Sequence, residues 1–389
     1  MKNRIISIFN EVFNSDPRMI AFSPGRINLM GEHLDYNGGN VLPCAISLGI
    51  YGAISFNSSS NINLYSHNVR DGISTYNLNK SLENQKKGKW SDYIAGVIWA
   101  LRRDKKIVLN EGFNMIIYGD LPNSSGLSSS AALETLAIFL INELYGLNLS
   151  KFELVLLAKK CENDFINVKC GVMDQFSVIF GKKNKAIFLD TQDINKFKYV
   201  SFKSNDYSLL IVNSNLRRNL ISSKYNERYD ECQKIVEFLN SQNDSKYKYI
   251  CDIPIEKEGY YISKIPNDTL KKRFQHVVEE NERTKKSIFY LENNDFSSFG
   301  QIMYDSHNSL KNLYEVSCDE LNEIVSIAST NGAIGARMTG AGFGGCVIIL
   351  TKINNALKIS EEVKKGFLEK FHFSPSIYVV GIVDGTHLL

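Results

Sequence analysis

The spacing of apolar residues along this 389-residue chain alternates between helical and strand periodicity. Apolar residues three or four positions apart predict helices, and short apolar runs bounded by turn residues predict strands. The predicted helices cover residues 92–103, 128–145, 151–163, 225–240, 270–291, 321–329 and 356–370. The predicted strands cover residues 49–56, 62–65, 113–118, 186–189, 209–212, 347–350 and 377–383. Because the two types mix without a regular strand-helix-strand repeat, we expect an α+β fold with mixed sheets.

The first residues of the chain also follow a helical pattern. Between Met1 and Asp16 the apolar positions are interrupted by Asn10 and Glu11, so an amphipathic helix is predicted rather than the apolar core of a signal peptide. No run approaches the roughly 18 apolar residues that a membrane span needs. We therefore expect a soluble, cytoplasmic protein with no membrane partner.

Length and composition limit the remaining possibilities. A chain of this length can hold two cores, and we expect domains over residues 1–195 and 196–389. The net charge of +3 and the short, scattered basic clusters argue against a nucleic-acid partner. Seven cysteines without a Cys-x-x-Cys pair fit a reducing compartment and indicate neither a zinc nor a disulfide framework. No exposed apolar face can be assigned from the pattern, and we expect a monomer.

Residues 25–39 place four chemically versatile side chains within ten positions. The segment reads Gly-Arg-Ile-Asn-Leu-Met-Gly-Glu-His-Leu-Asp-Tyr-Asn-Gly-Gly and contains Arg26, Glu32, His33 and Asp35. Its glycines and asparagines predict a loop, so we expect these side chains to lie outside a core. Two carboxylates, an imidazole and a guanidinium could hydrogen-bond the hydroxyls of a small polyol. A solvated surface turn with incidental charges is the alternative.

A run of small residues precedes the helix predicted from residue 128. It reads Ser-Gly-Leu-Ser-Ser-Ser-Ala-Ala from Ser125 to Ala132 and follows a strand and Pro122. Small residues let the backbone aim several N–H groups into one concavity, and the positive end of the helix favours an anion there. A serine hydroxyl in this place can also ligate Mg²⁺. The alternative is a plain serine cap at the start of a helix.

A second glycine-rich segment covers residues 340–345, Gly-Ala-Gly-Phe-Gly-Gly. It formally satisfies the dinucleotide fingerprint, but a strand and not a helix follows, so we reject dinucleotide binding. The companion motifs of a P-loop or of a protein kinase are absent from the sequence. The segment is interpreted as a glycine turn that lets its backbone approach a ligand or another loop closely, with a simple tight hairpin as the alternative.

Two further carboxylates are candidates for chemistry. Asp174 is a lone carboxylate in a mostly apolar context, which suits a general base, although a surface or capping aspartate is the more common identity. Glu162 lies in the last turn of a predicted helix and is either a Mg²⁺ ligand or part of the polar face of that helix.

These loops, in this order, resemble the three motifs of the GHMP small-molecule kinases. Residues 25–39 are similar to the galactokinase signature. The same resemblance extends to Cys-Gly-Val-Met-Asp-Gln at 170–175, Ser-Lys-Tyr-Asn-Glu-Arg at 223–228 and Ala-Arg-Met-Thr-Gly-Ala-Gly-Phe-Gly-Gly-Cys at 336–346. It runs from about residue 19 to the last residue and implies a two-domain fold with the active site in the cleft between the domains.

The resemblance also implies a role for individual residues. Asp174 would be the base on an anomeric hydroxyl and Arg26 its charged neighbour, and both would share one cleft with the start of the helix at residue 128. Ser130 and Glu162 would hold Mg²⁺. The residues that would contact galactose are Glu32, His33, Asp35, Gly171, Asp174 and Tyr225. The residues that would bind ATP are Ser66, Ser124, Ser125, Gly126, Leu127, Ser128, Ser129 and Ser130.

The implied reaction makes galactose 1-phosphate and ADP from ATP and α-D-galactose, the first committed step of the Leloir pathway. A kinase for N-acetylgalactosamine or another polyol stays open, because the walls around C2 of the sugar cannot be read from the sequence. A mevalonate or homoserine kinase is disfavoured, since neither needs Glu-His-Leu-Asp at residues 32–35. A galactose- and ATP-binding regulator without catalysis is disfavoured, because the serine run and Asp174 are intact.

Three residues depart from the family pattern. Ser124 replaces a usual glycine, Lys224 replaces the customary glutamate before Tyr225, and Ala341 replaces a frequent glycine. None of these changes removes a group to which the resemblance assigns catalysis.

Overall fold

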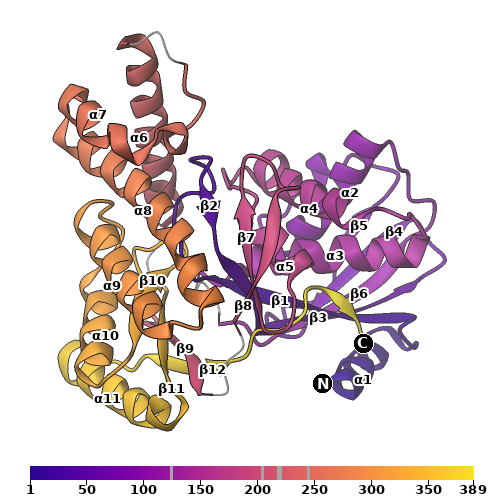
Figure 1. Ribbon diagram of the computed structural model, residues 1–389. Helices are drawn as coiled ribbons and strands as arrows, with labels where there is room; N and C mark the ends of the chain where they lie inside the picture. The colour runs from indigo at the N-terminus through magenta and orange to yellow at the C-terminus, as the bar shows by residue number, and fades with distance from the viewer. Residues whose placement is uncertain (123–125, 203–205, 217–220, 243–245) are drawn as a thin grey trace.

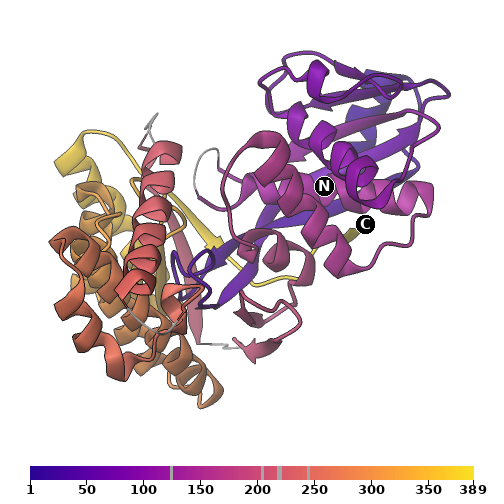
Figure 2. The ribbon, with the colours of Figure 1, turned by 90° about the horizontal axis from the view of Figure 1, so that it is seen from above.

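The computed structural model describes residues 1–122, 126–202, 206–216, 221–242 and 246–389. Within these residues the chain forms two lobes, seen side by side in Figures 1 and 2. The α-helices are α1 (Lys2–Phe13), α2 (Ser91–Lys105), α3 (Ser129–Tyr145), α4 (Lys151–Lys160), α5 (Met173–Phe180), α6 (Ile221–Gln242), α7 (Glu258–Lys264), α8 (Asp268–Glu292), α9 (Phe296–Asn312), α10 (Asp319–Thr330) and α11 (Ile353–Phe371). Shorter helical segments are Glu83–Gln85, Cys161–Ile166, Ile250–Asp252 and Ile255–Lys257.

The strands of the described residues form three sheets. Their bounds are β1 (Met19–Asn28), β2 (Asn40–Val41), β3 (Pro43–Phe56), β4 (Asn61–Ser66), β5 (Ser74–Asn77), β6 (Phe113–Gly119), β7 (Lys185–Asp190), β8 (Phe197–Ser201), β9 (Tyr207–Asn213), β10 (Gly335–Thr339), β11 (Cys346–Lys352), β12 (Ser376–Val380) and β13 (His387–Leu388). The six-stranded sheet has the order β13-β1-β3-β6-β4-β5, the four-stranded sheet β10-β11-β9-β12, and the three-stranded sheet β2-β7-β8.

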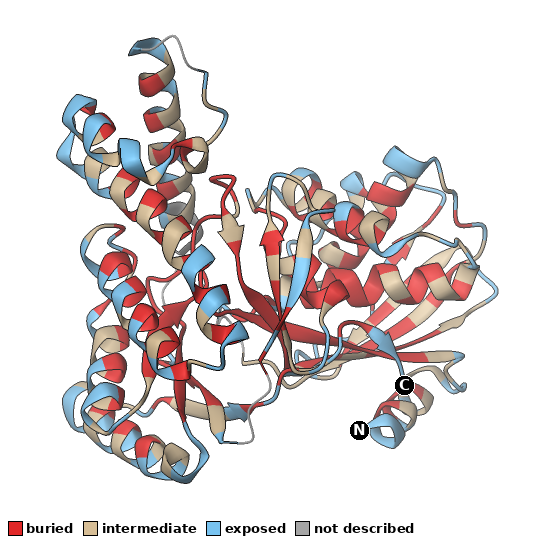
Figure 3. Cartoon of the chain, in the orientation of Figure 1, coloured by how far each residue is buried: buried red, intermediate tan, exposed pale blue. Residues whose placement is uncertain are grey.

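Helix α3 is the central helix of the lobe that contains the six-stranded sheet. It packs against β1 and β3 of that sheet and against α2, α4 and α5. Its side chains are apolar around most of the helix, and Leu136, Ala137 and Leu140 are fully buried. A helix that is apolar on all sides is expected inside a core, because no face of it suits water. Figure 3 shows this helix as a largely buried rod.

The second lobe is built on the four-stranded sheet. Strand β11 lies between β10 and β9, and all its residues but Lys352 are buried. Helices α9, α10 and α11 pack against this sheet, and α8 packs against α9. Such a run of apolar residues in a short strand is typical of a strand covered on both faces. No helix in the described part of the chain combines the length and apolarity needed to cross a membrane.

The fold expected from the sequence is confirmed in its main elements. Each predicted helix and strand overlaps an element of the same type. The elements that the periodicity did not reveal include β1, β10, α5 and α9. Strand β1 contains Pro24 and Gly25, which break the alternation expected of a strand. In α9, Gly300 and several serines interrupt the apolar pattern expected of a helix.

The division into domains near residue 195 remains a proposal. Strands β7 and β8 pair with each other on either side of that point. Near the last residue, β13 returns to the first sheet, where Leu388 lies opposite Ala21 of β1. The chain therefore connects the two lobes more than once.

Candidate active site

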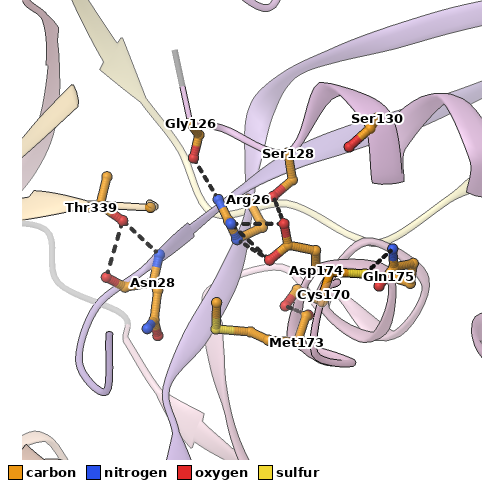
Figure 4. A network of polar contacts seen from close by, with 12 residues as sticks. Arg26, Asn28, Gly126, Ser128, Ser130, Cys170, Met173, Asp174, Gln175 and Thr339 are labelled. Carbon is orange, nitrogen blue, oxygen red and sulfur yellow. Dashed lines mark hydrogen bonds and ion pairs between the residues drawn. The ribbon is translucent and has the colours of Figure 1, made fainter. Parts of the chain in front are cut away.

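Arg26 and Asp174 form a two-pronged ion pair between β1 and the first turn of α5. Arg26 Nε donates to Asp174 Oδ1 at 2.8 Å, and Arg26 Nη2 donates to Oδ2 at 2.8 Å (Figure 4). A planar guanidinium matches a carboxylate in this way, whereas an ammonium does not. Burial opposes the charge on Arg26, but Asp174 and Glu32 raise the pKa of Arg26 above its ordinary value. The guanidinium is therefore charged and holds both carboxylate oxygens in place.

Asp174 receives a third hydrogen bond from Ser128, the residue before α3. The Ser128 hydroxyl donates to Asp174 Oδ2, and the backbone of Ser128 has a left-handed φ of 60°. Ser128 makes no side-chain cap to α3, so the interpretation as a plain serine cap is wrong for this residue. An ionised carboxylate accepts about four hydrogen bonds, and three are filled. The Asp174 side chain is 26% exposed, so a ligand can reach the remaining acceptor position.

The same guanidinium also holds the serine-rich segment. Arg26 Nη1 donates to the carbonyl of Gly126 at 2.7 Å, and the Arg26 backbone N–H donates to the carbonyl of Leu127 at 3.2 Å. Leu127 is 1% exposed, so its side chain is packed inside the protein. The structure thus brings together Asp174, Arg26 and the start of α3, as the sequence predicted.

The first residues of α3 offer an anion site. Ser129 and Ser130 begin the helix, where the first N–H groups have no intrahelical partner and the helix dipole is positive. Ser124 and Ser125, which were also predicted to bind ATP, lie outside the described residues. The described part of the predicted phosphate segment is therefore residues 126–130.

Ser130 and Glu162 lie next to each other, as expected for shared ligands of one cation. Ser130 Oγ donates to Glu162 Oε1 at 2.9 Å, and Gln175 Nε2 donates to Glu162 Oε2 at 2.7 Å. Glu162 belongs to a π-helical segment, and burial together with Asp174 raises its pKa. The described residues contain no group of three or more His, Cys, Asp or Glu able to hold a metal. Two oxygen donors nevertheless fit Mg²⁺, which prefers oxygen ligands and usually keeps several waters.

A cavity of about 210 Å³ opens beside the start of α3. Ser129 and Ser130 line it, and so does Ser66, the residue that the sequence placed near the nucleotide with the least support. The rest of its wall includes Asn68, Trp90, Tyr93, Ile117 and Leu133. Sequence reasoning did not identify these wall residues, because they are dispersed apolar and aromatic positions without a motif.

Asp35 and Gly171 are in close contact with each other. A Cβ atom added to Gly171 would lie 2.0 Å from Asp35 Oδ2, so only glycine fits against this carboxylate. Burial, followed by repulsion from Asp174 and Glu32, raises the pKa of Asp35 to about 7. Three carboxylates thus influence one another in this region.

Glu32 and His33 are buried, with exposed fractions of 2% and 3%. The prediction that the polar side chains of residues 25–39 lie on a loop outside a core is therefore wrong for these two and for Arg26, which lies in strand β1 and is 5% exposed. A solvated turn is excluded. The physical reason is that each finds a buried partner. Glu32 Oε1 accepts hydrogen bonds from Thr339 Oγ1 at 2.8 Å and from the Gly340 N–H at 2.9 Å, and Arg337 Nη2 lies 3.3 Å away.

His33 is part of an aromatic cluster. Its Nδ1 is 2.8 Å from the Tyr36 hydroxyl, and its ring centroid lies 5.6 Å from that of Tyr225 and 4.9 Å from that of Tyr314. Burial lowers the pKa of His33 to about 3, so the imidazole is neutral. The predicted contact residues His33 and Tyr225 are therefore neighbours. Tyr314, from the loop after α9, carried no signal in the sequence.

The glycine turn between β10 and β11 approaches the serine-rich segment, as predicted. Gly340 has φ of +84°, and a Cβ atom there would lie 2.8 Å from the carbonyl oxygen of Gly126. The turn also joins two antiparallel neighbours, but residues 340–345 separate the paired Thr339 and Cys346, so this is a hairpin with a longer loop and not a tight one. Thr339 binds Glu32 and accepts from the Asn28 N–H at 3.2 Å (Figure 4). Thr339 lies in the segment 336–346, which the sequence identified as a motif, but the sequence did not assign a role to this residue.

Comparison with known proteins agrees with this geometry. Residues 7–56 match the galactokinase galactose-binding signature, residues 92–182 the GHMP kinases N terminal domain, and residues 288–368 the GHMP kinases C terminal domain. A galactokinase of Clostridium acetobutylicum is 40% identical over 99% of this chain and 98% of its own length. One from Staphylococcus saprophyticus is 42% identical over 98% of each chain.

The chain belongs to the galactokinase family. A solved structure of Lactococcus lactis galactokinase complexed with galactose superposes with a TM-score of 0.94, at 36% identity and with full coverage of both chains. The expected GHMP-kinase fold is therefore confirmed for this galactokinase-family chain.

Proposed function

We propose that this galactokinase-family chain transfers the γ-phosphoryl group of ATP to the anomeric hydroxyl of α-D-galactose. Membership of the family makes the chain a sugar kinase with ATP as the phosphoryl donor. The observation that carries the proposal is the meeting of Arg26, Asp174 and Ser128 at the start of α3. It places a carboxylate with one free acceptor position beside a helix end suited to phosphate.

Asp174 acts on the sugar hydroxyl. Arg26 and Ser128 fill three acceptor positions of its carboxylate, so the fourth accepts the hydrogen bond of the attacking hydroxyl and orients its oxygen toward the phosphoryl group. As the new O–P bond forms, the hydroxyl proton passes to the Asp174 carboxylate, while the O–P bond to ADP breaks. Proton transfer to a positioned side chain contributes about 10²- to 10⁴-fold to a rate.

The ATP phosphates bind along residues 126–130. The N–H groups at the start of α3 and the guanidinium of Arg26 offset negative charge on the phosphoryl oxygens, which is the main need of phosphoryl transfer. The adenine base occupies the cavity lined by Ser66 and Trp90. Ser130 and Glu162 would hold Mg²⁺, which would supply positive charge to offset the charge of the phosphates.

Galactose binds on the opposite side of Asp174. Asp35, Glu32 and His33 provide hydrogen-bonding groups, the backbone of Gly171 closes against Asp35, and Tyr225 provides an aromatic wall. The galactose that the Lactococcus lactis structure contains supports a hexose as occupant. We also propose that the enzyme is a monomer and lies in the cytoplasm.

A coupled assay of ADP release tests the function. kcat/KM is measured for galactose, N-acetylgalactosamine and glucose, with Mg²⁺ present and then removed by a chelator. We expect galactose to give the highest value and the chelator to abolish turnover. Absence of turnover on galactose would overturn the proposal. In that case turnover of N-acetylgalactosamine would indicate a different sugar kinase, and galactose binding by calorimetry without turnover would indicate a regulator.

A further inference from the structure

Helix α8 carries a buried polar face. His276, Glu280 and Thr284 are four positions apart, so they lie on one side of the helix. Asn281 lies next to them, and all four side chains are buried. Buried polar side chains need hydrogen-bond partners. These residues lie outside all three matched family segments, and the reaction proposed above gives them no role.

This face holds both ends of the loop between β1 and β2. Near the start of the loop, Glu280 Oε1 accepts a hydrogen bond from the Gly31 N–H at 3.1 Å. At its end, Asn281 Oδ1 accepts from the Asn40 N–H at 3.0 Å and from Asn40 Nδ2 at 3.1 Å. Figure 1 shows β2 next to α8. The predicted galactose contacts at residues 32–35 therefore lie between two anchors on one helix.

The carboxylate of Glu280 is a fixed and charged anchor. Its Oε1 also accepts from Ser306 Oγ of α9 at 2.7 Å, and its Oε2 accepts from Arg283 Nε at 2.8 Å. Burial opposes its charge, but Arg283 and Arg337 lower the pKa of Glu280 to about 2. An ionised acceptor makes a stronger hydrogen bond to the Gly31 N–H than a neutral acceptor does.

The backbone at Gly31 is closely packed between α8 and β2. Its φ is +92°, and a Cβ atom there would lie 2.6 Å from the Asn40 carbonyl oxygen and 3.0 Å from Thr284 Oγ1. Glu32 follows directly, and its carboxylate is bonded to the turn between β10 and β11. Because a side chain moves with its backbone, the anchor at Gly31 decides whether the Glu32 carboxylate keeps its place.

We propose that Glu280 and Asn281 are positioning residues, which hold the two ends of the loop and so keep Glu32 in place for galactose. This inference rests on the proposed function, since it takes galactose as the ligand. Both residues act through the loop and not on a ligand. The phosphate segment is held by Arg26 instead, so ATP binding should not depend on this face of α8.

Glu280→Gln tests the first anchor in the full chain. The amide keeps the shape of the side chain but replaces one acceptor oxygen by a donor, so it cannot accept from both Gly31 and Arg283. The KM for galactose should rise roughly 10- to 100-fold, the range for a hydrogen bond to a charged group, while kcat and the KM for ATP stay within about twofold. Hydrogen–deuterium exchange without ligand should become faster in residues 29–40 and stay unchanged in α3.

Two control variants separate this role from general stability. Ser306→Ala removes the other donor to the same oxygen of Glu280, so it should lower the free energy of unfolding but leave the KM for galactose unchanged. Glu279→Gln changes the neighbouring carboxylate of α8, whose Oε2 accepts from Arg283 Nη1 at 3.2 Å. It should also leave the KM for galactose unchanged.

The second anchor is tested in the same way and decides the matter if Glu280→Gln does not fold. Asn281→Ala removes the acceptor for Asn40 and should raise the KM for galactose several fold, with kcat and the KM for ATP unchanged. Asn281→Asp keeps an acceptor oxygen at the same place and should restore the wild-type KM.

A wild-type KM for galactose in folded Glu280→Gln or Asn281→Ala would overturn the inference. An equal rise in Ser306→Ala, or a parallel rise in the KM for ATP, would do the same, because either would indicate general damage. Failure of the proposed function is recognised separately, since exchange in residues 29–40 is measured without ligand. If the loop loosens as expected but the wild type does not phosphorylate galactose, the proposed function fails and the role toward galactose fails with it.

Discussion

At the scale of single residues, the structure gives Arg26 two tasks at once. Its Nε and Nη2 hold both oxygens of Asp174, and its Nη1 holds the carbonyl of Gly126. The carboxylate that faces the sugar and the segment that faces the phosphates are thus fixed by one planar group. A change at this position therefore affects the binding of both ligands.

Arg26→Lys should lower kcat/KM for galactose by roughly 100-fold. The ammonium keeps the charge but cannot make the paired bonds to Asp174, and hydrogen bonds to charged groups are worth about 1.5–3 kcal/mol each. Steady-state kinetics with galactose and ATP measure the effect. Arg103→Lys is the matched control, because Arg103 is exposed and its ion pair with Asp164 spans 3.8 Å. Equal losses in the two variants would contradict a role of the planar fork.

Asp174→Asn should lower kcat by about 10²- to 10⁴-fold, the usual contribution of a positioned proton acceptor. The amide nearly matches the carboxylate in shape, so galactose binding measured by calorimetry should persist. A variant that retains kcat within a few fold would exclude Asp174 as the base.

Gly171→Ala should raise the KM for galactose by at least about tenfold, which corresponds to 1.4 kcal/mol of lost binding. The added methyl group would lie 2.0 Å from Asp35 Oδ2 and must displace that carboxylate. Gly259→Ala is the control, since a Cβ atom there meets nothing within 4 Å. An unchanged KM in Gly171→Ala would show that Asp35 does not contact the sugar.

At the scale of elements, periodicity accounts for most of what could be predicted. Helices such as α3 and α8 carry a sustained apolar pattern, and strands such as β9 are continuous apolar runs, so their positions follow from the sequence. Strand β1 was hidden, because Pro24 and Gly25 break the pattern although the strand continues to Asn28. A strand that carries Arg26 into a site is shaped by long-range partners, which local propensity does not contain.

The turn between β10 and β11 leads to an element-scale prediction. Gly340→Ala should raise the KM for ATP several fold, because the added Cβ would lie 2.8 Å from the carbonyl oxygen of Gly126 and push on the phosphate segment. Gly332→Ala isolates the backbone strain, since Gly332 has a φ of +83° and its added Cβ would meet only Asn355, at 3.4 Å. Both variants should lose stability in thermal unfolding. A similar KM change in both would mean that strain and not the contact is responsible.

At the scale of the whole molecule, the candidate site was only partly predictable. The motif residues were found by resemblance, but the burial of Glu32 and His33 was not, because their partners Thr339 and Tyr314 lie some 280 to 310 positions away. No local pattern tells a buried, satisfied carboxylate from a solvated one. The cavity beside α3 could not be predicted from the sequence either, since residues of several separate elements form its wall.

Burial also sets how the stability of the molecule depends on pH. It lowers the pKa of His33 and His276 to about 3 and that of His307 to about 4. Below the unfolded pKa of about 6.5, these three histidines bind protons in the unfolded chain but not in the folded protein. They therefore lower the free energy of unfolding as the pH drops from 6.5 toward 4. The pKa of Asp35 is raised to about 7, so this carboxyl makes the free energy of unfolding rise as the pH falls.

His307→Gln should therefore weaken the loss of stability on acidification. For a shift from about 6.5 to about 4, the loss between pH 7 and pH 5 should be smaller than in the wild type by roughly 2 kcal/mol. Urea unfolding of both proteins at the two pH values measures the difference. The same pH dependence in both would show that the pKa of His307 in the folded protein equals its pKa in the unfolded chain.

The hydrogen bonds that Glu32 accepts from the Thr339 hydroxyl and the Gly340 N–H have a consequence for synthesis. A chain emerging from the ribosome acquires Arg26, the serine-rich segment and Asp174 early, but the two hydrogen-bond donors that orient the Glu32 carboxylate come only with residues 339 and 340. An incomplete chain therefore lacks a finished sugar site and should not consume ATP. The chain becomes able to catalyse the reaction only when almost the entire polypeptide has been made.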